Sequence, residues 1–242
     1  MRPTLLFLPG TLCDARVWSG TIHALGNDWP CAAIDYRFDT SIAKMAATAL
    51  AAVDGAIIPV GLSMGGIVAL EIWRQAVDRV AAMALFDTDP GADSDERGRR
   101  RDVQVRMARS GDFRKMLETQ LLPAYFSPAN ESNATLHETV IAMALDQGFD
   151  AFEAQAQALA TRPNAWPQLE GITAPTLVAC GDDDRICLPE THQRMAELLP
   201  VPTLRTIAGA GHLAPLEQPA RCAQVLRDWL NGLATATSVS YP

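Results

Sequence analysis

The sequence predicts an α/β protein with a doubly wound, mostly parallel sheet of about six strands and an inserted set of helices. Three observations favour this fold class. Short apolar runs alternate with helical patterns along most of the 242-residue chain. The run at residues 80–86 is apolar without alternation, as expected when helices cover both faces of a sheet. One long central segment holds helical patterns only, which indicates an insertion between two strands.

Each core element follows from its local composition. The strands are short apolar runs, predicted at residues 4–8, 31–35, 56–60, 80–86, 175–180 and 203–207. The core helices place apolar side chains at helical spacing, and are predicted at residues 15–25, 41–53, 67–73, 190–199 and 217–233. Right-handed crossovers would bring the carboxyl ends of all these strands to one edge of the sheet, where sites form.

The central segment, residues 88–169, is predicted to form a helical cap over that edge. Its helical patterns cover residues 95–109, 112–121, 132–146 and 149–160, with proline-containing loops between them. The α/β core then comprises residues 1–87 and 170–234. Residues 235–242 are polar and are predicted to be a frayed C-terminal tail.

Composition excludes several classes of partner. The net charge is −8 and the pI is about 5.0, whereas nucleic acids and anionic membranes bind basic faces. The one basic cluster, Arg97 with residues 99–101, follows acidic residues and is interpreted as a solvated helix face with internal ion pairs. No apolar run approaches the ~18 residues of a membrane span. Five widely spaced cysteines without a C-x-x-C pattern indicate reduced thiols in a cytoplasmic protein.

The most informative motif is G-x-S-x-G at residues 61–65, between the strand at 56–60 and the helix at 67–73. A serine on a strand-to-helix turn is presented as a nucleophile. Gly61 and Gly65 remove side chains that would clash with the neighbouring strand or helix. The pentapeptide alone also fits a plain turn with an exposed serine, so its context and its partners carry the argument.

A serine nucleophile needs a base within reach. Of the four histidines, only His212 follows a strand through a run of small residues, at the edge where the site is expected. His23 and His192 fit ordinary surface or packing histidines, and His137 lies in the predicted cap. His212 is therefore the candidate base.

The base in turn needs an orienting carboxylate. Three consecutive aspartates, residues 182–184, follow the strand at 175–180 in the chain order serine, acid, histidine. Clustered like charges are costly to bury, so one of the three is expected to point inward. No metal-ligand spacing and no phosphate-binding glycine loop occurs, and no metal or cofactor is expected.

A developing oxyanion needs two backbone N–H donors. One is expected from Met64, the residue after the nucleophile. The other is expected from the loop at residues 9–12, because Gly10 lets that loop turn close to the serine. The same Pro9-Gly10 pair also fits a plain turn.

Four motifs, in order, resemble those of the α/β-hydrolase superfamily, and more narrowly the small capped esterases and C–C hydrolases. They are residues 8–11, 61–66, 181–185 with Pro189, and 209–212 with 217–219. The resemblance covers nearly the whole chain. It implies Ser63 as nucleophile, Asp184 as acid and His212 as base, with the N–H groups of Thr11 and Met64 as oxyanion donors.

Two departures from the family pattern stand out. The family usually has His-Gly where this chain has Pro9-Gly10, which puts the geometry of the oxyanion loop and the substrate range in question. The two N-terminal antiparallel strands of larger members have no counterpart, because the first apolar run begins at Thr4. About six core strands are therefore expected instead of eight.

The predicted activity is hydrolysis of a carboxylic ester with a small to medium apolar acyl group, through an acyl-enzyme. Alternatives are the same triad acting on a C–C bond, lactone or thioester, and a non-catalytic ligand-binding protein. The expected partner is a small molecule, with no nucleic acid or membrane, in a monomer or homodimer. Candidate pocket residues, with ordinary core as the alternative for Trp18 and Met83, are Trp18, Met64, Met83, Phe86, Trp166 and Leu213.

Overall fold

A computed structural model describes residues 2–238 of the chain, with side chains as far as residue 233. Six strands form one sheet in the order β2-β1-β3-β4-β5-β6, and every neighbouring pair is parallel. They are β1 (Thr4–Leu8), β2 (Cys31–Ala33), β3 (Ile57–Leu62), β4 (Met83–Phe86), β5 (Thr176–Gly181) and β6 (Pro202–Ile207). The predicted parallel, doubly wound sheet is confirmed.

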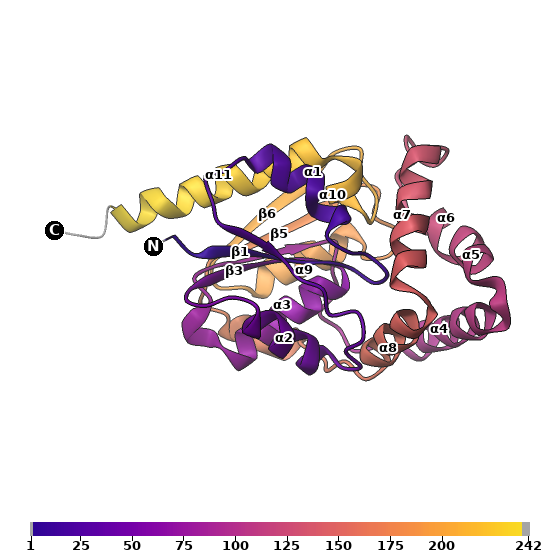
Figure 1. The fold of residues 1–242 in the computed structure, drawn as a ribbon. Coiled ribbons are helices and arrows are strands. Elements are labelled where there is room, and N and C mark those ends of the chain that lie inside the picture. Colours follow the sequence, from indigo (N-terminus) through magenta and orange to yellow (C-terminus); the bar gives the residue numbers. More distant parts are fainter. Residues whose placement is uncertain (1, 239–242) are drawn as a thin grey trace.

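Helices cover both faces of this sheet, as the apolar strands require (Figure 1). On one face lie α1 (Arg16–Leu25) and α11 (Pro219–Ser238), and on the other α2 (Ile42–Ala51), α3 (Met64–Gln75) and α9 (Pro189–Leu198). Successive side chains of β1 enter different cores: Leu5 and Phe7 pack with α1 and α11, Leu6 and Leu8 with α2 and α3. Short elements η1 (Val77–Arg79) and α10 (Ala214–Glu217) complete the core.

The strand order reverses at β1. The chain passes from β1 to β2 on one side and then to β3 on the other, so β1 and β3 are neighbours. In open α/β sheets, ligands bind in the crevice at the carboxyl ends of strands where the order reverses. The loop after β1, residues 9–12, and the turn after β3, at Ser63, both lie at that crevice.

Between β4 and β5 the chain forms a helical insertion, residues 88–169, which lies beside the carboxyl edge of the sheet (Figure 1). Its larger helices begin and end close to the predicted limits. The elements are α4 (Asp95–Met107), η2 (Ala108–Asp112), α5 (Phe113–Met116), η3 (Leu117–Leu121), α6 (Leu122–Tyr125), α7 (Ala134–Gln147) and α8 (Phe149–Ala160), followed by η4 (Trp166–Gly171).

The C-terminal helix is longer than its composition suggested. α11 continues to Ser238, so residues 235–238 of the predicted tail are helical, and residues 239–242 lie outside the described residues. Within residues 2–238, no helix combines the length and the hydropathy needed to cross a bilayer. All five cysteines carry free thiols.

Candidate active site

Ser63 occupies a strained turn between β3 and α3. Its backbone has φ +52° and ψ −115°, a left-handed conformation that costs free energy for a residue with a Cβ. Close packing holds it there: a Cβ on Gly65 would overlap the Leu8 carbonyl of β1, and one on Gly61 would overlap the backbone of Gly65. The Ser63 N–H also donates to the Phe86 carbonyl at 2.9 Å. The turn thus lifts the Ser63 side chain to the carboxyl edge of the sheet.

The three residues of the expected triad come together. His212 Nε2 lies 2.9 Å from Ser63 Oγ, and His212 Nδ1 lies 3.0 Å from Asp184 Oδ2 and 3.1 Å from Oδ1. A carboxylate accepts only, so Nδ1 carries the proton and Nε2 is free to accept from the serine hydroxyl. His212 is 4% exposed and Asp184 2% exposed, which shields this hydrogen-bonded chain from water.

The structure distinguishes the three consecutive aspartates. Asp182 and Asp183 are exposed, and Asp182 accepts hydrogen bonds from Gly209 N–H (2.8 Å) and Ala210 N–H (3.3 Å). Asp184 alone points inward, where its Oδ1 accepts from the N–H groups of Ile186 and Cys187 at 2.8 and 3.0 Å. Burial by itself raises the pKa of the Asp184 carboxyl. The charge and hydrogen bond of His212 outweigh it and hold that pKa below its usual value.

The loop that carries His212 is tied to the helical insertion. The His212 N–H donates to the Tyr125 carbonyl at 2.9 Å. Glu217 accepts from the Gly211 N–H at 2.6 Å with one oxygen, and from Ser127 and Asn130 with the other, at 2.7–3.0 Å. Glu217 therefore joins the histidine loop to the segment after α6.

The residues expected to form the oxyanion site lie beside Ser63. Gly10, Thr11 and Met64 line the same cavity as Ser63, and Thr11 Oγ1 lies 3.8 Å from Met64 Sδ. The Tyr36 hydroxyl donates to the Pro9 carbonyl at 2.5 Å, so a tyrosine after β2 fixes the loop in which the family usually has histidine. From the insertion, Gln155 Oε1 accepts from the Leu12 N–H at 2.8 Å.

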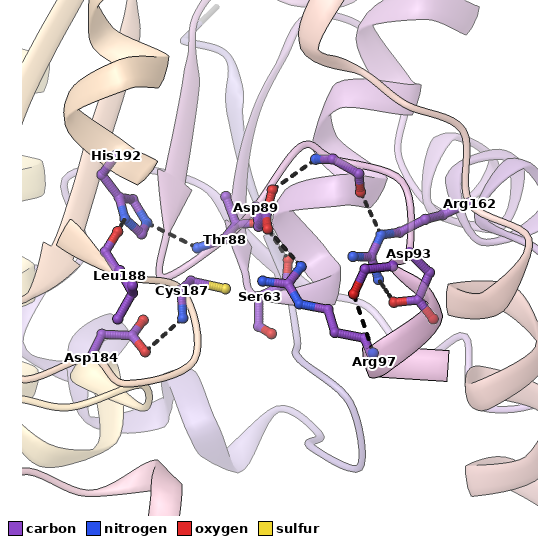
Figure 2. A network of polar contacts seen from close by, with 12 residues as sticks. Ser63, Thr88, Asp89, Asp93, Arg97, Arg162, Asp184, Cys187, Leu188 and His192 are labelled. Carbon is purple, nitrogen blue, oxygen red and sulfur yellow. Dashed lines mark hydrogen bonds and ion pairs between the residues drawn. The ribbon is translucent and has the colours of Figure 1, made fainter. Parts of the chain in front are cut away.

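A second polar network lies behind the nucleophile, and sequence reasoning missed it (Figure 2). Thr88 Oγ1 donates to the Ser63 carbonyl at 2.7 Å, and the Thr88 N–H donates to His192 Nε2 at 3.0 Å. His192 Nδ1 lies 3.1 Å from the Leu188 carbonyl, so it is the protonated nitrogen. The ring is fully buried, and burial lowers the pKa of His192. Its helical position after Pro189 gave no signal beyond ordinary packing.

The sequence patterns also did not predict a role for a second buried aspartate, Asp87. It directly follows the apolar strand β4, which was the available signal, and its Oδ1 accepts from the Gly181 N–H at 2.8 Å. Burial, and then the nearby charge of Asp184, raise the pKa of the Asp87 carboxyl well above its usual value. The pKa values of these two neighbouring carboxyls are therefore shifted in opposite directions.

A cavity of about 380 Å³ opens at Ser63 and His212. Of the six candidate pocket residues, Met64 and Leu213 line it, whereas Trp18, Met83, Phe86 and Trp166 do not. Trp18 and Phe86 are fully buried and in edge-to-face contact, with centroids 5.4 Å apart, and Trp18 Nε1 donates to the Leu8 carbonyl. Trp166 stacks under the Arg194 guanidinium instead. Large aromatic side chains fill the core between β1, β4 and α1 because apolar area is buried there.

The basic cluster of α4 is partly the solvated face that the sequence suggested, because Arg99 and Arg100 are exposed. Arg97, Arg100 and Arg101 line the cavity, because α4 lies over the site. Ion pairs do form, as expected: Arg101 pairs with Asp93 of the preceding acidic residues, and Arg97 pairs with Asp89.

One group of side chains has the spacing of metal ligands within the described part of the chain. The ligand atoms of Asp184, Cys187 and His212 lie within 4.8 Å of one another. Asp184 and His212 already bond to each other, and burial raises the pKa of the Cys187 thiol well above its usual value. A neutral thiol is a poor metal ligand, so the donor set fits the triad better than a metal.

Comparison with known proteins places the chain in a family. A family model described as the Alpha/beta hydrolase family matches residues 5–225. The chain belongs to the alpha/beta hydrolase family. This alpha/beta hydrolase superposes on a thermophilic esterase from Thermogutta terrifontis, solved with malate bound, with a TM-score of 0.88 and 29% identity. The likeness covers 96% of this chain and 90% of the esterase.

Two sequence relatives bear the name 2-succinyl-6-hydroxy-2,4-cyclohexadiene-1-carboxylate synthase. The alpha/beta hydrolase is 27% identical to that of Serratia proteamaculans, over 95% of this chain and 93% of the relative. It is 25% identical to the one assigned in Bacillus subtilis, over 72% of this chain and 65% of the relative. The family is therefore shared by proteins named for different reactions.

Proposed function

We propose that this protein is a serine hydrolase that cleaves a carboxylic ester of small to medium size through an acyl-enzyme. The observation that carries the proposal is the continuous chain of hydrogen bonds from Ser63 Oγ through His212 to Asp184. The serine lies on a strained turn at the floor of a cavity of about 380 Å³. The similarity to an esterase over nearly the whole chain supports an ester as the substrate.

In the proposed reaction, His212 Nε2 takes the proton of Ser63 as the oxygen attacks the ester carbonyl. Asp184 keeps the proton on Nδ1 and stabilises the imidazolium that forms. The N–H groups of Thr11 and Met64 receive the oxyanion, and His212 then protonates the leaving alcohol. Water activated by His212 releases the acid and restores Ser63.

The first test is steady-state hydrolysis of p-nitrophenyl acetate, butyrate and octanoate by the wild type and Ser63→Ala. We expect the variant to fold and to lose turnover by roughly 10⁴-fold or more, since the triad acts as a unit. Multiple turnover by the wild type separates an enzyme from a ligand-binding protein, which would release one equivalent at most. Full activity in Ser63→Ala would refute the proposal.

The names of the two synthase relatives favour a second candidate. In it, the same triad acts on a bond other than a carboxylic ester, such as a C–C bond, a lactone or a thioester. A panel of lactones and acyl thioesters, measured beside the p-nitrophenyl esters, decides between the two candidates. Turnover of one of these substrates without ester hydrolysis favours the second.

A further inference from the structure

The cavity beside Ser63 has a cationic wall. Three arginines come from α4, one follows α8 and one follows β5; they are Arg97, Arg100, Arg101, Arg162 and Arg185. The acidic residues that line the same cavity are Asp89 and Glu96. In a chain with a net charge of −8, such a concentration of positive charge is local, and attack on a neutral ester does not require it.

The arginines outnumber their carboxylate partners in the deeper part of this wall. Arg101 and Arg162 share a single carboxylate, that of Asp93, with Arg162 Nη1 3.4 Å from Asp93 Oδ1. The side chains of Arg162 and Asp93 are only 5% and 7% exposed. Burial lowers the pKa of the Arg162 guanidinium, and the charges of Arg97 and Arg101 lower it further. The wall thus holds surplus positive charge, which an anionic ligand would neutralise.

The Arg97 guanidinium, which lines the cavity, has N–H donors that are not used in hydrogen bonds to the described residues. Its Nη1 donates to Asp89 Oδ2 at 2.6 Å, and within residues 2–238 its side chain makes no other hydrogen bond. Figure 2 shows the guanidinium of Arg97 pointing from α4 toward Ser63 and the sulfur of Cys187. Arg100, three residues further along the helix, lines the cavity, and its side chain has neither an ion pair nor a hydrogen bond with the described residues.

We infer that the substrate of this site carries a carboxylate, which Arg97 and Arg100 bind while its ester carbonyl lies at Ser63. A guanidinium presents two parallel N–H groups that match the two oxygens of a carboxylate. Asp89 orients Arg97 from one side and leaves Nε and Nη2 for the ligand. The inference rests on the proposed hydrolase function and specifies its substrate class, a half-ester of a dicarboxylic acid or an ester of a hydroxy acid.

The test compares matched pairs of esters. Monomethyl glutarate and its neutral monoamide differ only in the charge on the acyl part, and butyryloxyacetate and its amide differ in the charge on the alcohol part. For at least one pair we expect the wild-type kcat/KM of the anionic ester to exceed that of the neutral ester about tenfold or more. Equal kcat/KM values in both pairs would overturn the inference while ester hydrolysis itself stands.

Substitutions on α4 test which arginines cause the preference for anionic esters. Arg97→Gln and Arg100→Gln should each raise KM for the anionic ester about tenfold, with little change for the neutral one. Arg97→Lys keeps the charge but loses the paired donors. Its KM for the anionic ester should therefore lie between those of the wild type and Arg97→Gln. Arg99→Gln makes the same charge change on the exposed part of α4 and should match the wild type. If Arg99→Gln weakens the preference as much as Arg97→Gln, the effect is non-local and the inference fails.

Binding without turnover separates this inference from the proposed function. Glutarate is titrated calorimetrically into Ser63→Ala, and into Ser63→Ala carrying Arg97→Gln. Binding that Arg97→Gln weakens about tenfold supports the carboxylate site, even if no ester is hydrolysed and the proposed function fails. Absence of glutarate binding, together with equal hydrolysis of charged and neutral esters, overturns the carboxylate site alone.

Discussion

At the scale of single residues, two buried aspartates at neighbouring strand ends have pKa values that are shifted in opposite directions. Asp184 accepts from His212 and from two backbone N–H groups, and these contacts hold its pKa below the usual value. Asp87 accepts from the Gly181 N–H, and burial and then the charge of Asp184 raise its pKa. Ionising two close carboxyls is costly, so the carboxyl that accepts more hydrogen bonds, Asp184, loses its proton more readily.

This difference can be tested with the same substitution at both sites. Asp184→Asn removes the negative charge that fixes the His212 tautomer, and kcat should fall by roughly 10⁴-fold. Asp87→Asn keeps the shape of the side chain and an acceptor oxygen for the Gly181 N–H, and kcat should stay within about threefold of the wild type. Steady-state kinetics on one ester measures both. A loss of activity in Asp87→Asn as large as in Asp184→Asn would show that catalysis also needs the Asp87 carboxylate, and would contradict the prediction.

His192 gives a pH dependence of stability. Burial lowers its pKa in the folded protein from 6.5, so below pH 6.5 the unfolded chain binds a proton that the folded chain does not. Stability is therefore complete above pH 6.5 and falls as the pH drops, by at most about 1.4 kcal/mol per pH unit. Urea unfolding at pH 7.5 and 5.0 should show this decrease in the wild type and a smaller one in His192→Gln. Equal decreases in the unfolding free energy of the wild type and His192→Gln would show that groups other than His192 cause the pH dependence.

At the scale of elements, the helical insertion takes part in building the site. Glu217 of α10 bonds the Gly211 N–H on one side and Ser127 and Asn130 on the other, and Gln155 of α8 accepts from the Leu12 N–H. The insertion therefore holds both the histidine loop and the loop after β1. Its position affects the catalytic geometry as well as access to the cavity.

Glu217→Gln tests this coupling. The amide has one acceptor oxygen in place of two, so either the histidine loop or the segment after α6 loses its hydrogen bonds. We expect kcat to fall about tenfold with little change in KM, because the base is displaced and the cavity is retained. Unfolding free energy should fall by about 1–3 kcal/mol. Glu170→Gln, the same substitution at an exposed position of η4, serves as a control and should alter neither kcat nor the unfolding free energy.

At the scale of the whole molecule, the sheet separates two apolar cores, and the aromatic side chains stabilise one of them. Phe7, Trp18 and Phe86 pack at ring-centroid distances of 5.2 and 5.4 Å between the sheet and α1. Their burial makes Trp18 and Phe86 structural residues in this fold. The cavity is lined by arginines of the insertion together with apolar side chains such as Ile67, Phe152 and Leu213.

Trp18→Phe distinguishes core from pocket. The substitution leaves the buried Leu8 carbonyl without its indole donor and leaves space between Phe7 and Phe86, so unfolding free energy should fall by about 1–3 kcal/mol. At a temperature where the variant stays folded, KM for each ester should equal that of the wild type. Denaturant unfolding and steady-state kinetics provide the two measurements. A changed KM with unchanged stability would show that Trp18 contacts the substrate and would contradict its assignment to the core.

Sequence patterns alone were enough to predict the succession of strands and helices along the chain, the parallel sheet and the candidates Ser63 and His212. These features depend on local signals: apolar periodicity, a glycine-flanked serine, and small residues before a histidine. Three features could be seen in the folded structure alone. Arginines of α4 line the cavity, and Trp18 and Phe86 are buried in the core. Asp87 and His192 hydrogen-bond to backbone N–H groups next to the site. Contacts between segments far apart in the chain set these orientations, and the sequence pattern of either segment alone does not contain them.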